Sequence, residues 1–435
     1  METKQRETPR ILIFTMTSWN SKVGANTWES LLIGRDREKL ANIFIRDEIP
    51  DSQICSKYFC ISENRVIKSI LKRKIKTGQE VIAQPLYEAE QSEDLRAHNE
   101  RYAKMKKKRR YSMLLARELL WKLGKWKTKE LDAFLDEFKP DIILHGMDGY
   151  IHMNRIVRYA QKRTGAKAIG YIWDDNFTYK QSKKLGYKIY RYFQRRSLKK
   201  LVKQTQAFFA ITPKTKKEAD EFFNINCTLL SKPLNISPVA ESYETSNKPL
   251  KMLYTGNLLI GREQTLAKLS FALKEINKDT NNVVLDVYTQ TALSEEYLKE
   301  TQNEFCRIHP PIPQAEVLQL QKEADVLLFL EDLSDRNLTA RLSFSTKITD
   351  YFSAGKCILA IGNQDLAPMQ YFKETASAVM VDNAQDILKG LQMLLIRENL
   401  AYYAKNAVEC GIKNHRAEHI RQTFDGVISR LYQGE

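Results

Sequence analysis

The sequence of 435 residues has no uninterrupted apolar stretch of the roughly 18–20 residues that a membrane-spanning helix needs. Its charged first ten residues are followed by an apolar run, 11–16, that is too short for a secretory signal. The six cysteines include no C-x-x-C pair, so the sequence offers neither a disulfide framework nor a zinc ribbon. We therefore expect a cytoplasmic protein without a metal site.

Acidic residues in the first half of the chain are far too few to balance the basic ones. Through residue 240 there are 48 Lys and Arg against 27 Asp and Glu, a net charge of +21, whereas the remainder has 21 against 26, a net charge of −5. Residues 101–203 alone hold 28 basic and 9 acidic residues. The first half therefore either meets an anionic partner or presents a solvated basic face. Because no recognised nucleic-acid motif accompanies the charge, we expect no nucleic acid partner.

Short β-rich runs alternate with helix-length amphipathic segments, which is typical of parallel sheets with crossover helices. The expected strands are 11–14, 41–45, 141–144, 166–173 and 207–211, then 250–254, 283–288, 325–330, 357–361 and 378–381. The expected helices are 27–40, 129–138, 154–163, 214–223, 263–276, 314–323, 347–353, 384–396 and 414–431.

A polar stretch separates the two series of strands. Residues 237–249 have no apolar periodicity, so we interpret them as an interdomain linker. The sequence thus predicts two α/β domains, 1–236 and 250–413. The last segment, 414–435, is expected to be helical and could join the first domain.

The second domain opens with a strand, a turn and a helix that suit a phosphate. Gly256 and Gly261 lie between the strand and the helix and allow a ligand to approach the backbone. Arg262 adds a cation, and Lys268 follows within the helix. An ordinary turn between strand and helix is an equally good interpretation, because the spacing is neither G-x-G-x-x-G nor a Walker loop.

A second helix start lies further along this domain. Ser345 or Thr346 is a good N-cap for a helix that ends at Gly355, ahead of a buried strand. Lys347 would lie in its first turn, at the sheet edge where ligands of open α/β folds bind. Asp350 could accept hydrogen bonds from a ribose, or could be a solvated helix residue.

Three segments, 254–258, 324–328 and 345–359, resemble the nucleotide-sugar domain of GT-B glycosyltransferases, and they are most similar to family 4 with its capsule and exopolysaccharide enzymes. The resemblance implies an α/β fold of two Rossmann-like domains, with parallel sheets that face a central cleft. It also implies that Gly256, Asn257, Arg262 and Lys268 hold the donor diphosphate, together with the helix start at 345–347. Asp350 would hold the ribose.

The activity implied by the resemblance is hexosyltransferase-like. A sugar would move from a nucleotide-diphosphate sugar, with UDP favoured, to a glycan or lipid-linked acceptor in cell-surface polysaccharide synthesis, with retention and without a metal or cofactor. The sequence departs from the family at a pair of glutamates: Leu342 and Asp350 stand at these two positions here. Glu331, Asp332 or Asp335 could supply the missing carboxylate.

Loops of the first domain offer acceptor-side candidates. In the resembling family a glycine-bearing loop lies beside the donor and acceptor, which points to Gly24. His145 follows a strand and would face the cleft, where it could bind sugar hydroxyls or assist deprotonation of the acceptor. Asp174 and Asp175 end the next strand and could bind the acceptor or act as a base. A structural role is open for each of these side chains.

Basic residues with interleaved Trp, Tyr and Leu fill the segments 101–129 and 180–203. This composition suits peripheral attachment to the anionic inner face of a cell membrane. The alternative to membrane attachment is a solvated basic face. The alternatives to a glycosyltransferase are a nucleotide-sugar epimerase of the same double-Rossmann plan, a nucleic-acid-binding protein and a catalytically inactive scaffold.

Overall fold

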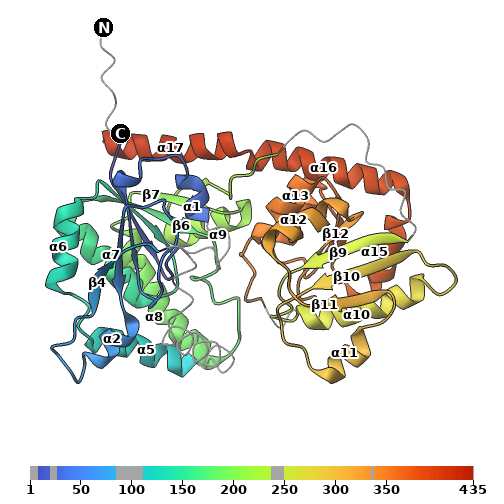
Figure 1. Ribbon diagram of the computed structural model, residues 1–435, viewed down its shortest axis with the longest axis horizontal. Coiled ribbons are helices and arrows are strands. Elements are labelled where there is room, and N and C mark those ends of the chain that lie inside the picture. The colour runs from blue at the N-terminus through green and yellow to red at the C-terminus, as the bar shows by residue number, and fades with distance from the viewer. Residues whose placement is uncertain (1–7, 20–26, 85–110, 237–248, 335–337, 435) are drawn as a thin grey trace, which may run out of the picture.

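The computed structural model describes residues 8–19, 27–84, 111–236, 249–334 and 338–434. Gly24, Asp335, most of the predicted linker and the basic segment 101–110 lie outside these residues. Two sheets organise the described chain (Figure 1). The first has the order β4-β3-β2-β1-β5-β6-β7-β8, and it is parallel except that β4 runs antiparallel to β3.

The strands of the first sheet are β1 (Ile11–Thr15), β2 (Leu40–Phe44), β3 (Lys57–Ile61), β4 (Gly78–Val81), β5 (Ile142–Gly146), β6 (Lys167–Ile172), β7 (Ala207–Ala210) and β8 (Cys227–Leu229). The helices around it are α1 (Thr27–Leu32), α2 (Glu63–Lys68), α5 (Tyr111–Leu123), α6 (Lys129–Phe138), α7 (Ile151–Thr164), α8 (Leu185–Val202) and α9 (Pro213–Phe223), with a 3₁₀ turn at Arg37–Lys39.

Both faces of this sheet are buried. Leu12 and Phe14 of β1 pack on one side, and Ile11 and Ile13 pack on the other. The strands are therefore apolar without alternation, as expected of a parallel sheet covered by helices on both faces. Local sequence sets the helix ends as well, since the side chain of Thr128 caps α6 by accepting from the amide of Leu131.

The second sheet is wholly parallel, with the order β11-β10-β9-β12-β13-β14. Its strands are β9 (Leu250–Thr255), β10 (Val283–Tyr288), β11 (Cys306–His309), β12 (Val326–Leu330), β13 (Cys357–Ile361) and β14 (Val379–Val381). The helices of this half are α10 (Arg262–Ile276), α11 (Glu295–Thr301), α12 (Gln314–Glu323), α13 (Thr346–Ala354), α14 (Ala367–Thr375), α15 (Ile387–Leu394) and α16 (Arg397–His415), with a 3₁₀ turn at Ala384–Asp386.

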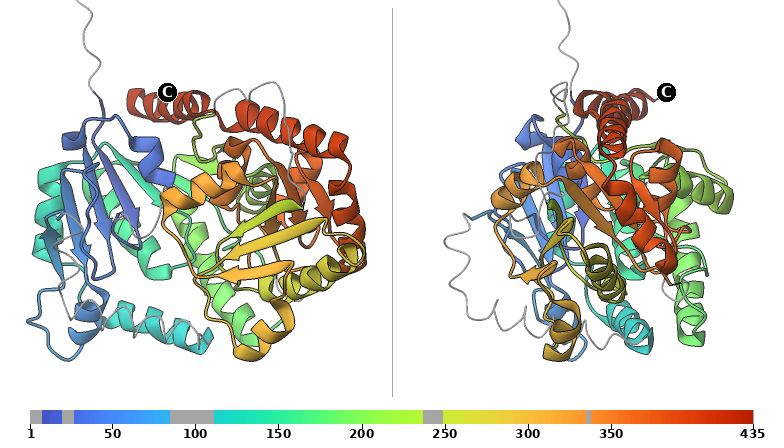
Figure 2. Two further views of the ribbon diagram at one scale, coloured as in Figure 1. Left: turned by 45° about the vertical axis from the view of Figure 1, so that its right-hand side comes forward. Right: turned by 90° about the vertical axis from the view of Figure 1, so that its right-hand side faces the viewer.

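The last two helices run one after the other along one side of both halves of the chain, at the top in Figure 1 (Figures 1 and 2). α16 packs on β13 and α13 of the second half. The final helix, α17 (Ala417–Gln433), returns to the first half, where Phe424 packs among the rings of Trp28 and Phe209. The end of the chain thus contributes to the core around the first sheet.

Every strand predicted above is present, but some elements were missed or misjudged. Strands β3, β4 and β8 were not predicted, and of these the edge strand β4 and the short strand β8 have no clear alternation in sequence. The predicted helix 27–40 is wrong beyond Leu32, because the side chain of Asp36 caps a separate 3₁₀ turn by accepting from Glu38 and β2 then begins at Leu40.

Candidate functional site

Loops at the carboxyl ends of the two sheets meet. Arg341, which follows β12, donates from Nη2 to Oδ2 of Asp175 after β6 at 2.8 Å and to Oε2 of Glu218 on α9 at 2.7 Å. Burial opposes ionisation of Asp175, which is fully inaccessible, but the charge of Arg341 and the hydrogen bonds from Thr178 and Arg341 together hold the pKa of this carboxyl below its usual value. Ser343 donates a hydrogen bond to Asp174 beside this cluster.

The predicted phosphate turn lies at this same edge of the second sheet. Gly256 follows β9 with φ +144°, in the region that favours glycine. A Cβ at this position would lie 2.5 Å from Nζ of Lys347, so the glycine backbone and the ammonium are neighbours. The ammonium also stands over the ring of Tyr254, 4.5 Å from its centroid.

Arg262 begins α10 and completes this group of cations. Its Nε and Nη2 donate to both carboxylate oxygens of Glu331 at 3.0 and 2.6 Å, and its Nη1 donates to Oδ1 of Asn257 at 2.6 Å. Burial, reinforced by the charge of Arg262 and opposed by Glu331, lowers the pKa of Lys347 to about 8. Gly256, Asn257, Arg262 and Lys347 therefore form one cluster, with Glu331 as a carboxylate inside it.

The start of α13 lies against this cluster. Ser345 is its N-cap, and its side chain accepts from the amide of Lys347 at 3.4 Å, while Thr346 is exposed. Asp350 lies one turn further along and is 3.5 Å from Nζ of Lys232. Burial raises the pKa of Asp350 even though Lys232 opposes the shift.

Three predicted site residues are placed differently from expectation. His145 is fully buried, its ring nitrogens lie 3.2 Å from the Gly146 carbonyl and from the Thr205 hydroxyl, and burial lowers its pKa to about 4, so the expectation that it faces the cleft is wrong. Lys268 lines a separate hollow beside α15 and does not join Arg262. Asp175 forms a buried ion pair with Arg341, so its carboxylate is not placed to act as a base.

The position of the missing glutamate also has a structural role. Leu342 is fully buried and packs in the apolar core beneath the first sheet, and its carbonyl accepts from the hydroxyl of Thr215 on α9 at 3.2 Å. It therefore anchors the second half of the chain on the first. Of the alternative carboxylates, Glu331 pairs with Arg262, and Asp332 accepts from the amide and hydroxyl of Ser334 at 2.9 Å.

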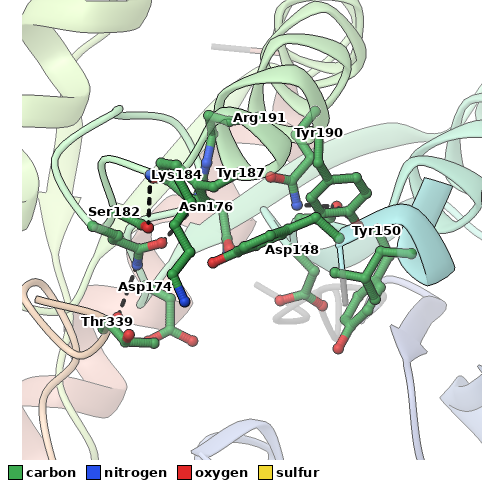
Figure 3. Close-up of a pocket in the computed structure, with 15 residues that line it drawn as sticks. Asp148, Tyr150, Asp174, Asn176, Ser182, Lys184, Tyr187, Tyr190, Arg191 and Thr339 are labelled. Carbon is green, nitrogen blue, oxygen red and sulfur yellow. Dashed lines mark hydrogen bonds between the residues drawn. The ribbon is translucent and has the colours of Figure 1, made fainter. Parts of the chain in front are cut away.

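Sequence reasoning missed a hollow of about 540 Å³ in the first half of the chain (Figure 3). Asp148 after β5 and Asp174 after β6 lie on one side of it, and Arg191 of α8 lies on another. Burial and the neighbouring Asp174 raise the pKa of Asp148 to about 7. The sequence signal for this hollow was the polar residues at the carboxyl ends of β5 and β6. Asp148 is one of them and lies three residues beyond His145.

Comparisons with known proteins identify the fold. No family model matches the sequence, and no curated protein matches it. Among solved structures, HepE from Anabaena in complex with UDP-glucose has a TM-score of 0.58 at 11% identity, covering 97% of this chain and 100% of its own. An α,α-trehalose 6-phosphate synthase from Burkholderia multivorans has a TM-score of 0.59 at 9% identity, with 98% of both chains covered.

A third similar structure is the UDP-forming α,α-trehalose-phosphate synthase from Burkholderia xenovorans in complex with glucose 6-phosphate. Its TM-score is 0.55 at 9% identity, and 97% of this chain and 100% of that chain are covered. These similarities extend over nearly the whole chain. The chain therefore has the GT-B fold, with two parallel-sheet α/β domains.

Proposed function

We propose that this chain is a glycosyltransferase that moves a sugar from a nucleotide-diphosphate sugar, with UDP favoured, to a glycan or lipid-linked acceptor in cell-surface polysaccharide synthesis. The cluster of Gly256, Arg262 and Lys347 at the carboxyl edge of the second sheet carries this proposal. It combines an open backbone turn, two cations and the N-terminus of α10, which together suit a diphosphate. The complex of HepE with UDP-glucose supports the choice of UDP.

The proposed chemistry needs stabilisation of a leaving diphosphate. Arg262 and Lys347 would neutralise the charge that develops as the bond to the sugar breaks, without a metal. Arg262 would then have to share its guanidinium between Glu331 and the diphosphate. We also propose retention of configuration, in line with the family resemblance, and we assign the ribose to Asp350.

A thermal-shift panel with UDP, GDP, ADP and CMP tests the donor proposal. UDP should raise the melting temperature, and duplex DNA should not. Arg262→Ala alone would leave Glu331 buried without its partner, which is itself destabilising. The double variant Arg262→Met with Glu331→Gln keeps the pair neutral and should remove the UDP response at a melting temperature near that of the wild type. A full UDP response in this variant would refute the assignment.

We further propose that the first domain attaches to an anionic membrane surface. Within the described residues no helix is long and apolar enough to span a membrane. However, Leu185, Ile189 and Phe193 are exposed at i, i+4 and i+8 on α8, and Leu119 and Leu123 are exposed on α5, which contacts α8. Basic side chains of the same helices would add attraction of up to about 1 kcal/mol each.

Flotation with vesicles of phosphatidylglycerol and phosphatidylcholine tests this attachment. The wild type should float at low salt and much less at high salt, because exposed charges are screened. Leu185→Glu with Phe193→Glu should abolish flotation. Phe271→Glu is a control, since Phe271 is also an exposed apolar side chain, on α10 of the other domain. Absence of wild-type flotation at low salt would end the proposal.

A further inference from the structure

The hollow beside α8 contains a buried cation that the described residues satisfy only in part. Arg191 is 3% exposed, and its Nη2 donates to Oε1 of Gln181 at 2.6 Å. Its Nε and Nη1 have no hydrogen-bond partner among the described residues. The guanidinium carbon lies 5.1 Å from the centroid of the Tyr187 ring.

A second buried polar atom lies one turn along the same helix. Gln194 is 5% exposed, and its Nε2 donates to the carbonyl of Gly149 at 2.6 Å. Its Oε1 has no partner within the part of the chain that the structure describes. Burying a charged or polar group without a partner costs free energy, typically several kcal/mol for a charge. Two such groups lining one hollow therefore indicate a missing ligand.

The opposite side of the hollow suits hydroxyl groups. Asp148 and Asp174 present carboxylates there, and Asn176 adds an amide. Tyr150 and Tyr190 line the hollow with their rings (Figure 3). The volume of about 540 Å³ is within the range of small-ligand sites. A ligand that complements both sides carries an anion at one end and several hydroxyls at the other.

We propose that this pocket binds an anionic saccharide, a sugar that bears a phosphate or carboxylate group, with the guanidinium of Arg191 on the anion. The planar fork of Arg191 matches either group, and Lys184 at the rim adds a second cation. Gln194 accepts from a hydroxyl of the sugar through Oε1. On the proposed function, this ligand is the acceptor or the acceptor's terminal residue.

The position of the pocket relative to the donor cluster supports this role. Thr339 lines the pocket from the second half of the chain, and Ser343 hydrogen-bonds to Asp174 at its edge. Ser343 and Lys347 are four positions apart in the sequence, so their Cα atoms are at most about 14 Å apart. The short segment 338–347 therefore joins the edge of the pocket to Lys347, one of the two cations proposed for the donor diphosphate.

Isothermal titration calorimetry of the full chain tests the pocket directly. The probes are glucose 6-phosphate, glucuronate, glucose and inorganic phosphate, and a dodecyl ester of glucose 6-phosphate represents a lipid-linked source. We expect at least one charged sugar to bind roughly tenfold or more tightly than both glucose and inorganic phosphate, the scale of a hydrogen-bonded charge. If the dodecyl ester binds more tightly than glucose 6-phosphate, the result supports the same pocket and identifies a lipid-linked ligand.

Two variants locate the binding. Arg191→Met should weaken the charged sugar roughly tenfold or more, whereas Arg196→Met, which removes an exposed cation from the same helix, should not. Gln194→Glu keeps the size of the side chain and places a carboxylate one helical turn from Arg191, where it competes with the ligand's anion for the guanidinium. It should therefore weaken binding even if Arg191→Met fails to fold. Equal affinity in wild type and Gln194→Glu, or no preference for charged sugars, would overturn the inference.

Binding of UDP separates this inference from the proposed function. Arg191→Met and Gln194→Glu should keep the UDP response of the wild type, because neither residue belongs to the donor cluster. UDP binding without charged-sugar binding would refute the proposed role of the pocket and leave the donor proposal unaffected. Charged-sugar binding without any nucleotide response would do the reverse.

Discussion

Raising the pH through 8 should weaken the binding of UDP, because Lys347 must carry its proton to contact a diphosphate. Burial and the charge of Arg262 lower the pKa of Lys347 to about 8, with Glu331 opposing. With one site of pKa about 8, the affinity falls about tenfold between pH 7 and pH 9, or about 1.4 kcal/mol. Below pH 7 the ammonium is fully protonated, and this part of the affinity is constant.

Calorimetric titration with UDP across this pH range is the appropriate assay. The terminal phosphate of UDP loses its last proton near pH 6, so its charge hardly changes between pH 7 and pH 9. Lys347→Met should bind UDP more weakly at pH 7 and show no further loss by pH 9. Lys347→Arg remains charged and should also give a flat profile. An equal pH dependence in wild type and Lys347→Met would refute the reasoning.

Two further substitutions test the structure around the site. Arg341→Met leaves the buried carboxylate of Asp175 without its partner, which costs about 3–5 kcal/mol of folding free energy. The melting temperature should therefore fall by at least about 6 °C. The control Lys217→Met, on the exposed face of α9, should leave the melting temperature unchanged. Gly256→Ala should abolish the UDP response, because its methyl group meets the ammonium of Lys347. Gly34 also has a positive φ, +86°, but a Cβ there would have no neighbour within 4 Å, so Gly34→Ala should keep the response. Retention of UDP binding in Gly256→Ala would contradict the assignment.

The two sheets could be predicted because buried parallel strands are short apolar runs between amphipathic helices. The turn at Gly256 and the helix start at Ser345 were also accessible, since each depends on local chemistry of glycines and caps. The antiparallel edge strand Gly78–Val81 was not, because its residues show no alternation and its pairing with Lys57–Ile61 depends on distant contacts.

Side-chain direction and long-range pairing account for the errors at the site. His145 was predicted to follow a strand and lies inside β5, which ends at Gly146, and with helices on both faces of a sheet the sequence does not show which way a polar side chain points. The partners of Arg341 lie 166 and 123 residues away along the chain, at Asp175 and Glu218, and no local pattern joins them. The pairing of Arg262 with Glu331 is of the same kind.

A structure of the chain with UDP bound tests the central claim most directly. We predict that the terminal phosphate lies against the backbone of Gly256, within reach of the guanidinium of Arg262 and the ammonium of Lys347. UDP bound elsewhere, with Arg262 still held only by Glu331 and Asn257 and the ammonium of Lys347 in contact with no phosphate, would contradict the account.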